Sequence, residues 1–138
     1  MKIGAIVQAR MSSQRLPDKV LTMVNGKPLL QYLLERLTHC SSIDQIVVAT
    51  SEDKSDDPIA VFCHEYGVLC FRGPLQNVAK RFYMTLEKYN LDAFVRVCCD
   101  SPMLDHKLID QGVKLFNGEY DLVTNTLPRS YPVGQSVE

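Results

Sequence analysis

The sequence lacks several features that would assign it to a class of protein at once. Its net charge is −1 over 138 residues, so no excess of positive charge indicates binding to nucleic acid or to an anionic membrane. No apolar run approaches the roughly 20 residues of a membrane-spanning helix. The apolar start of the chain is interrupted by Gln8 and Arg10, which leaves it too short for a signal peptide. We therefore expect neither a nucleic-acid partner nor a membrane partner.

Cysteine spacing argues against two further classes. The five cysteines are odd in number, and no two of them are spaced as C-x-x-C. This pattern fits neither a disulfide framework nor a zinc site, so we expect reduced thiols and a cytoplasmic location. The cysteines are expected to pack as small apolar side chains. The alternative for Cys98 and Cys99 is a reactive thiol beside cations.

The residues that are present predict an α/β fold. The composition is 46% hydrophobic and 22% charged, as in an ordinary globular protein, and the length fits one domain, residues 1–138. Short apolar runs alternate with segments of helical periodicity. The expected strands are 2–8, 45–50, 68–71, 93–98 and 120–123, and the expected helices begin at Pro28, Ser55, Gly73-Pro74 and Asp105. This alternation predicts a doubly wound, mostly parallel sheet with helices on both faces.

Two charged segments follow expected strands. One is the loop after the first strand, and the other is the Cys99-Asp100 segment after the fourth. In open α/β sheets, ligands bind outside the carboxyl ends of the strands, where the strand order reverses. The two segments are therefore predicted to form one site.

The first loop carries the cations that a triphosphate needs. Arg10, Arg15 and Lys19 lie within ten residues, beside the small polar residues Ser12 and Ser13. Arginine binds phosphate in a bidentate manner, lysine acts as a point charge, and a loop offers free backbone N–H groups. The loop is neither a Walker A loop nor a G-x-G-x-x-G motif. Composition alone leaves open a solvated loop with three unrelated cations.

Asp100 is a candidate Mg²⁺ ligand, because magnesium binds through one or two carboxylates together with phosphate oxygens and waters. The alternative for Asp100 is a cap on the turn before Pro102. Arg96 lies in the preceding strand. It is a candidate nucleotide-binding residue, and the alternative is a strand-edge cation or a salt-bridge partner.

The string Q-A-R-M-S-S-Q-R-L-P-D-K-V-L, followed by N-G-K-P-L-L, resembles the signature of the cytidylyltransferases that make CMP-activated acidic sugars. That family includes the acylneuraminate and CMP-KDO synthetases, and the similarity is greatest to the branch of the spore coat polysaccharide biosynthesis protein SpsF. Later landmarks occur in the expected order: Ile46–Thr50, Asp57–Ile59, Phe71–Gly73, Arg96–Val97, Asp100–Pro102 and Asn125–Pro132.

The resemblance implies a fold and a reaction. The fold is the Rossmann-like fold of the nucleotide-diphospho-sugar transferases. The reaction is transfer of CMP from CTP to a sugar hydroxyl with release of pyrophosphate, in the synthesis of activated sugars for cell-surface or spore coat polysaccharide. The partners implied are CTP, an acidic sugar and a second copy of the chain in a homodimer. The alternative is a catalytically weak or inactive domain that binds a nucleotide or a protein partner.

The resemblance also implies roles for particular residues. Arg10, Arg15 and Lys19 bind the CTP phosphates with help from Ser13, and Asp100 holds Mg²⁺. The catalytic set is Arg10, Arg15, Lys19 and Asp100. The expected nucleotide-binding set is Gln8, Ala9, Arg10, Ser13, Arg15, Lys19 and Arg96. Backbone groups around the first loop are expected to select cytosine.

The chain departs from the family pattern at three points. Cys99 stands where the family has glycine, so we expect it to crowd the nucleotide or to strain the turn. Ser136 stands where the family has aspartate. Family members continue well past the position of Glu138. We therefore expect the nucleotide-binding part of the domain, truncated at the C-terminus, with the sugar contacts and most dimer contacts beyond it.

Overall fold

A computed structural model describes residues 1–12 and 17–138. At its centre is a four-stranded sheet in the order β5–β4–β1–β6, in which all neighbouring strands are parallel. A short antiparallel hairpin lies outside this sheet. The strands are β1 (Ile3–Gln8), β2 (Met23–Val24), β3 (Lys27–Pro28), β4 (Gln45–Ser51), β5 (Leu69–Gly73) and β6 (Ala93–Cys98).

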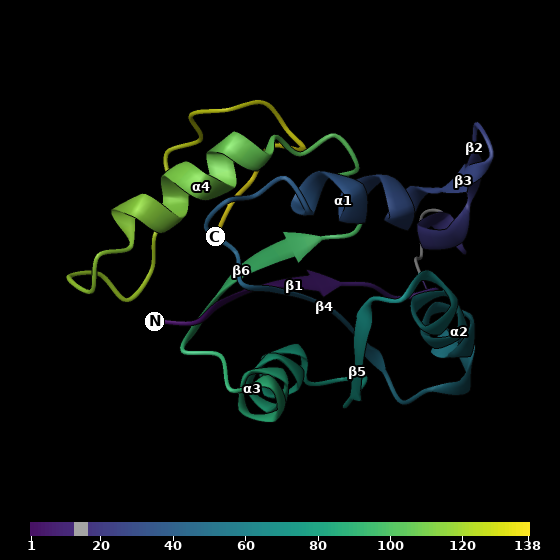
Figure 1. Ribbon diagram of the computed structural model, residues 1–138. Helices are drawn as coiled ribbons and strands as arrows, with labels where there is room; N and C mark the ends of the chain where they lie inside the picture. Colours follow the sequence, from purple (N-terminus) through teal and green to yellow (C-terminus); the bar gives the residue numbers. More distant parts are fainter. Residues whose placement is uncertain (13–16) are drawn as a thin grey trace.

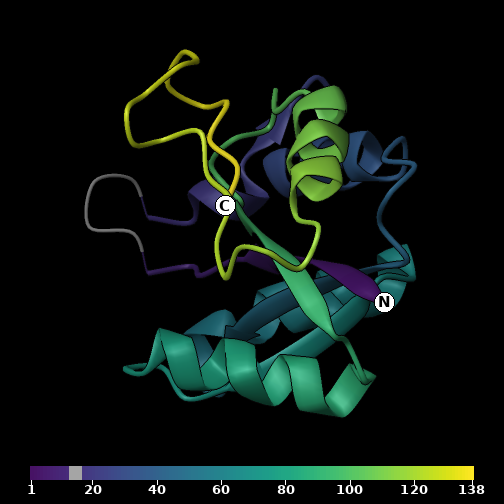
Figure 2. The same ribbon diagram turned by 90° about the vertical axis from the view of Figure 1, so that its left-hand side faces the viewer.

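Helices cover both faces of the sheet, which confirms the predicted doubly wound α/β fold (Figure 1). Helices α1 and α4 lie on one face and α3 lies on the other (Figure 2). The α-helices are α1 (Leu29–Leu37), α2 (Asp57–Tyr66), α3 (Val78–Tyr89) and α4 (His106–Leu115), and single 3₁₀ turns form η1 (Lys19–Leu21) and η2 (Lys54–Asp56). None of the helices in the described ranges is both long and apolar enough to cross a bilayer.

The main apolar core lies between the sheet and α1, α2 and α4. Leu30, Leu33, Leu34 and Leu37 of α1 are all at most 2% exposed, as their helical spacing predicts. Alternate residues of the strands complete this core, because successive side chains of a strand point to opposite faces. A second, smaller cluster on the α3 face contains Ile6, Ala49 and Phe82.

Two of the predicted helix starts are wrong. The start expected at Ser55 is a 3₁₀ turn, in which Asp53 Oδ1 accepts a hydrogen bond from the Ser55 N–H at 2.9 Å, and α2 begins only at Asp57. The helix expected from Gly73-Pro74 begins at Val78, because β5 continues through Gly73. Asn77 is the effective cap of that helix, since its Oδ1 accepts from the Lys80 N–H at 2.9 Å.

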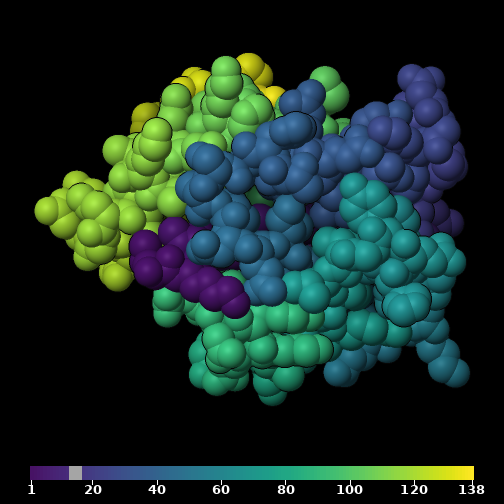
Figure 3. All heavy atoms as spheres, in the orientation of Figure 1, coloured from purple at the N-terminus to yellow at the C-terminus, as the bar shows by residue number. Residues whose placement is uncertain are grey.

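The expected strand at 120–123 is also wrong. The segment is irregular, and Tyr120 and Leu122 are 58% and 65% exposed. The chain after α4 projects from the body of the molecule as the light green lobe of Figure 3. Side-chain amides hold the tail instead: Asn125 Nδ2 donates to Gln135 O at 2.8 Å, and Asn125 Oδ1 accepts from Val137 N at 3.0 Å.

Candidate functional site

The carboxyl ends of β1 and β6 lie side by side at the point where the strand order reverses. From β1 the chain continues to β4 and β5 on one side and then crosses to β6 on the other. Gln8 pairs with Cys98, and the Cys99 N–H donates to Gln8 O at 3.1 Å. The loops that leave these strands are therefore neighbours, at the position where α/β sheets bind ligands.

Lys19 and Asp100 join the two charged segments. Lys19 Nζ lies 3.2 Å from Asp100 Oδ2, and the two side chains are 31% and 47% exposed. The prediction that both segments share one edge of the sheet is confirmed by this contact. An ion pair this exposed contributes about 1 kcal/mol or less, so either partner can exchange it for a ligand group at low cost.

The loop after β1 is fixed on both sides of Arg10. The Ala9 N–H donates to Ala49 O at 3.2 Å, and Ala9 is fully buried. The Met11 N–H donates to Asp56 Oδ1 at 2.7 Å, while Met11 O accepts from the Asp18 N–H at 3.1 Å. Arg10 is thus placed at the carboxyl edge between two held peptide groups.

Two residues of the expected site, Ser13 and Arg15, lie outside the described residues. Their phosphate-binding roles stay predictions.

Asp56 is a site residue that the sequence did not reveal. Its position beside Asp57 is typical of an ordinary acid in the first turn of a helix, but its carboxylate is fully buried. Besides Met11, the N–H and the hydroxyl of Ser51 donate to it. The available signal was its place in the chain, since an acid that closely follows a buried strand lies at the carboxyl edge of the sheet.

Arg81 is a second residue that sequence reasoning missed. It is fully buried in the first turn of α3, where its Nη1 donates to Pro74 O at 2.8 Å. Within the described part of the chain, its Nε and Nη2 have no hydrogen-bond partner. Burial lowers the pKa of Arg81, as does the nearby positive charge of Arg10, and Asp56 opposes both. In the sequence, the signal is an arginine within the apolar stripe of a helix.

Arg96 forms a salt bridge, as its alternative interpretation stated. Its Nη1 lies 2.6 Å from Glu138 Oε1, and its backbone N–H donates to Glu138 O at 2.7 Å. Its Nη2 also donates to Gln8 Oε1 at 3.4 Å, which places the guanidinium beside the end of β1. Binding of a nucleotide by Arg96 and Gln8 stays a prediction.

Cys99 does not strain its turn, and crowding of the nucleotide by its side chain stays a prediction. Its φ angle is not in the left-handed region that favours glycine, and its side chain packs against the main core. Burial, assisted by Asp100, raises the pKa of the Cys99 thiol to about 12. Burial also raises the pKa of Cys98. Burial thus disfavours the thiolate form of both cysteines, which argues against the reactive-thiol alternative.

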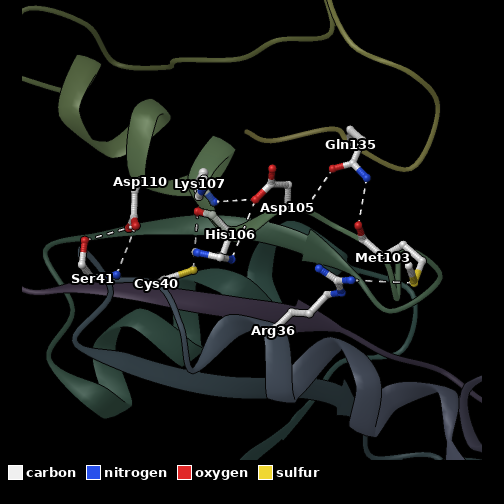
Figure 4. Close-up of polar contacts among 9 residues, drawn as sticks. All are labelled: Arg36, Cys40, Ser41, Met103, Asp105, His106, Lys107, Asp110 and Gln135. Atoms are coloured by element: carbon white, nitrogen blue, oxygen red, sulfur yellow. Dashed lines mark hydrogen bonds and ion pairs between the residues drawn. The ribbon is translucent and has the colours of Figure 1, made fainter.

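The segment that follows Asp100 is held by the tail (Figure 4). Gln135 reaches from the tail to the turn before α4, where its Oε1 accepts from the Asp105 N–H at 2.8 Å and its Nε2 donates to Met103 O at 2.9 Å. Asp105 caps α4 as predicted, because its Oδ1 accepts from the Lys107 N–H at 2.9 Å. The tail thus fixes the segment that follows the candidate metal ligand.

A parallel sheet with cations and a carboxylate gathered at its switch point is typical of nucleotide-binding α/β domains. The sequence of the loop after β1 is cationic instead of glycine-rich, which separates it from the P-loop motif. The chain belongs to the cytidylyltransferase family, whose sequence model matches residues 4–129. The resemblance seen in the sequence is confirmed by this match.

Individual relatives agree with the family. The chain is 40% identical over 125 residues to an uncharacterized protein of Methanocaldococcus jannaschii, a match that covers 90% of this chain and 51% of that protein. It is 35% identical over 109 residues to the spore coat polysaccharide biosynthesis protein SpsF of Bacillus subtilis, with 76% and 45% covered. A cytidylyltransferase structure from Leptospira borgpetersenii has a TM-score of 0.91 at 33% identity and covers 99% of this chain and 59% of its own. The chain spans about half the length of these curated relatives.

Proposed function

We propose that this chain binds CTP at the β1–β6 switch point and forms the nucleotide-binding part of an enzyme that transfers CMP to a sugar hydroxyl. The product is an activated sugar for cell-surface or spore coat polysaccharide. The observation that carries the proposal is the contact between Lys19 and Asp100, which brings a cation and a carboxylate to one strand edge. Membership of the cytidylyltransferase family supports the choice of nucleotide.

The proposed reaction is a displacement at the α-phosphorus of CTP. The sugar hydroxyl loses its proton and its oxygen bonds to the α-phosphorus, while the bond to the oxygen that bridges to the β-phosphate breaks and pyrophosphate leaves. Positioning and neutralisation of charge dominate such chemistry. In this proposal Arg10, Arg15 and Lys19 bind the phosphates and stabilise the leaving pyrophosphate.

Asp100 is the residue that would hold Mg²⁺. Within residues 1–12 and 17–138, no group of three or more histidine, cysteine, aspartate or glutamate side chains could bind a metal ion. A single exposed carboxylate still fits magnesium, since the ion completes its shell with phosphate oxygens and waters. When bound, Mg²⁺ supplies charge that neutralises the phosphate oxygens.

The cellular setting is also part of the proposal. All five cysteines are free thiols, which supports a reducing, cytoplasmic location. The family resemblance supports an acidic sugar as the acceptor and a homodimer as the assembly.

Nucleotide binding without transfer is the second candidate function. The chain spans about half the length of its curated relatives, and transfer needs a sugar site as well as a nucleotide site. Release of pyrophosphate from CTP with Mg²⁺ and a panel of acidic sugars separates the two. Saturable CTP binding without pyrophosphate favours the binding domain.

Replacement of Lys19 by alanine tests the nucleotide site directly. We expect Lys19→Ala to raise the Kd for CTP by about tenfold or more, because a charge-assisted hydrogen bond to phosphate is lost. Isothermal titration calorimetry with Mg²⁺ measures this. Lys114→Ala removes an exposed lysine of α4 and should bind CTP like the wild type. An unchanged Kd for Lys19→Ala contradicts the phosphate-binding role.

A further inference from the structure

We propose that Asp56 is a positioning residue for Arg10, and that it sets the geometry with which the loop after β1 meets the nucleotide. This inference rests on the proposed binding of CTP. Asp56 belongs to no motif of the sequence signature, and it reaches the loop only because the ends of β1 and β4 are adjacent.

The contacts of Asp56 connect the loop to the sheet. Its Oδ1 accepts the Met11 N–H at 2.7 Å, and this N–H belongs to the peptide group that directly follows the Arg10 Cα. Its Oδ2 accepts the hydroxyl of Ser51 and the Ser51 N–H, the latter at 3.3 Å, at the last residue of β4. One carboxylate thereby joins the backbone beside Arg10 to the end of a buried strand.

The carbonyl group of Met11 is held as well as its N–H. Met11 O accepts the Asp18 N–H at 3.1 Å, so both backbone groups of Met11 are engaged. Rotation of the peptide beside Arg10 would break the bond to Asp56. The direction in which Arg10 leaves the backbone is thus determined by a side chain 46 positions later in the chain.

An aspartate is required here for a chemical reason. A buried charge is costly unless it is fully hydrogen-bonded, and a carboxylate can accept from all three donors at once. An asparagine would turn its NH₂ group toward one of these donors. Asp56 also directly precedes α2, where the partial positive charge of the helix N-terminus stabilises a carboxylate.

Neighbouring acids show that the burial of Asp56 is specific. Asp57 is 54% exposed and pairs with Arg72 at 2.7 Å, while Asp53 accepts a hydrogen bond within its own 3₁₀ turn. Asp56 contacts the backbone beside Arg10, and the described residues show no salt bridge between the two side chains. In this proposal Asp56 acts on Arg10 through the backbone and not by neutralising its guanidinium.

Asp56→Asn tests the inference with two readouts, and Asp57→Asn is its matched control. We expect the Met11 amide of Asp56→Asn to exchange its hydrogen about tenfold faster or more, because its charged acceptor is lost. We expect the Kd for CTP with Mg²⁺ to rise by about tenfold in the same variant, since Arg10 is no longer preorganised. Asp57→Asn should match the wild type in both measurements.

Ile59→Val in α2 is the control for a general loss of stability, because it removes one buried methyl group. It should leave Met11 hydrogen exchange and the Kd for CTP unchanged. Should Asp56→Asn fail to fold, Ser51→Ala removes one donor and is expected to shift both readouts in the same direction by less.

Three different results would overturn the loop contact, the positioning role or the proposed function, and the measurements distinguish them. Unchanged Met11 exchange in folded Asp56→Asn refutes the contact that anchors the loop. Faster exchange with an unchanged Kd for CTP refutes the positioning role. Absence of CTP binding in the wild type refutes the proposed function itself, while Met11 exchange still decides whether Asp56 anchors the loop.

Discussion

The two faces of the central sheet are packed in different ways. The face covered by α1, α2 and α4 has a continuous apolar core, with the leucines of α1 at its centre. The α3 face has a smaller apolar cluster around Ile6, Ala49 and Phe82, and it also holds the charged Arg81. Stability is therefore concentrated on one face, and the other combines packing with charge close to the candidate site.

The charged groups of the α3 face are costly to bury. Each unpaired polar atom in an interior costs roughly 1–3 kcal/mol. Within the described residues, Arg81 has two such atoms and Arg96 has one. Buried polar atoms without hydrogen-bond partners are typical of functional sites, where the chemistry of the site takes precedence over good packing.

The largest effect on the free energy of unfolding is expected from leucine substitutions that compare the two faces of the sheet. Leu33→Ala on the packed face is expected to lower the free energy of unfolding by about 3–4 kcal/mol, because Leu33 is fully buried. Leu86→Ala in α3, where the side chain is only partly buried, should cost about half as much. Urea unfolding measures both, and equal losses would remove the contrast between the faces.

Replacement of Arg81 by methionine should have a smaller effect. Methionine has a similar volume and needs no hydrogen-bond partners, so it avoids the unpaired nitrogens while losing the bond to Pro74. These changes offset each other, and we expect the free energy of unfolding to change by no more than about 1 kcal/mol. A loss as large as that of Leu33→Ala would show that Arg81 is a fully satisfied structural group.

The smallest effect is expected at Asp110, which joins α4 to the turn before β4. Burial opposes its ionisation, but hydrogen bonds from Ser42 and Ser41 outweigh burial and lower its pKa (Figure 4). A lowered folded-state pKa stabilises the protein above the unfolded value near pH 4, and this stabilisation is lost as pH falls through the folded pKa. Asp110→Asn should lower the free energy of unfolding by about 0.5 kcal/mol or less at pH 7.

The pH dependence provides the check on that substitution. Unfolding curves recorded from pH 7 to about pH 2 should converge for wild type and Asp110→Asn at the acid end. A difference that stays constant over this range would mean that the side chain acts through packing and not through its charge.

Local patterns explain how much of the fold could be predicted. The apolar run of β1 and the leucine spacing of α1 are satisfied by burial on the sheet, so their predictions are confirmed. The run at 120–123 has the composition of a strand, but its side chains face solvent, and pairing depends on tertiary contacts that composition does not encode. The helix start at Val78 depended on Asn77, a cap four residues beyond the turn signal of Gly73.

The candidate site shows the same limit. Lys19 and Asp100 could be brought together from the sequence because each follows a strand whose end faces the same edge. The roles of Asp56 and Arg81 could not be predicted in this way, because they depend on the direction in which each side chain points. Asp56 and Asp57 are adjacent and chemically identical, yet one is fully buried and the other is exposed.

The central position of β1 has a consequence for how the chain reaches this structure. Its partners on the two sides are distant in sequence: the backbone N–H groups of Ile3 and Lys2, at its start, donate to carboxylates 41 and 90 positions away. Contacts of such separation slow folding, because a long loop must close before any contact is gained. Because β1 precedes both β4 and β6 in the chain, its apolar residues stay exposed to aggregation during synthesis until these partners have left the ribosome.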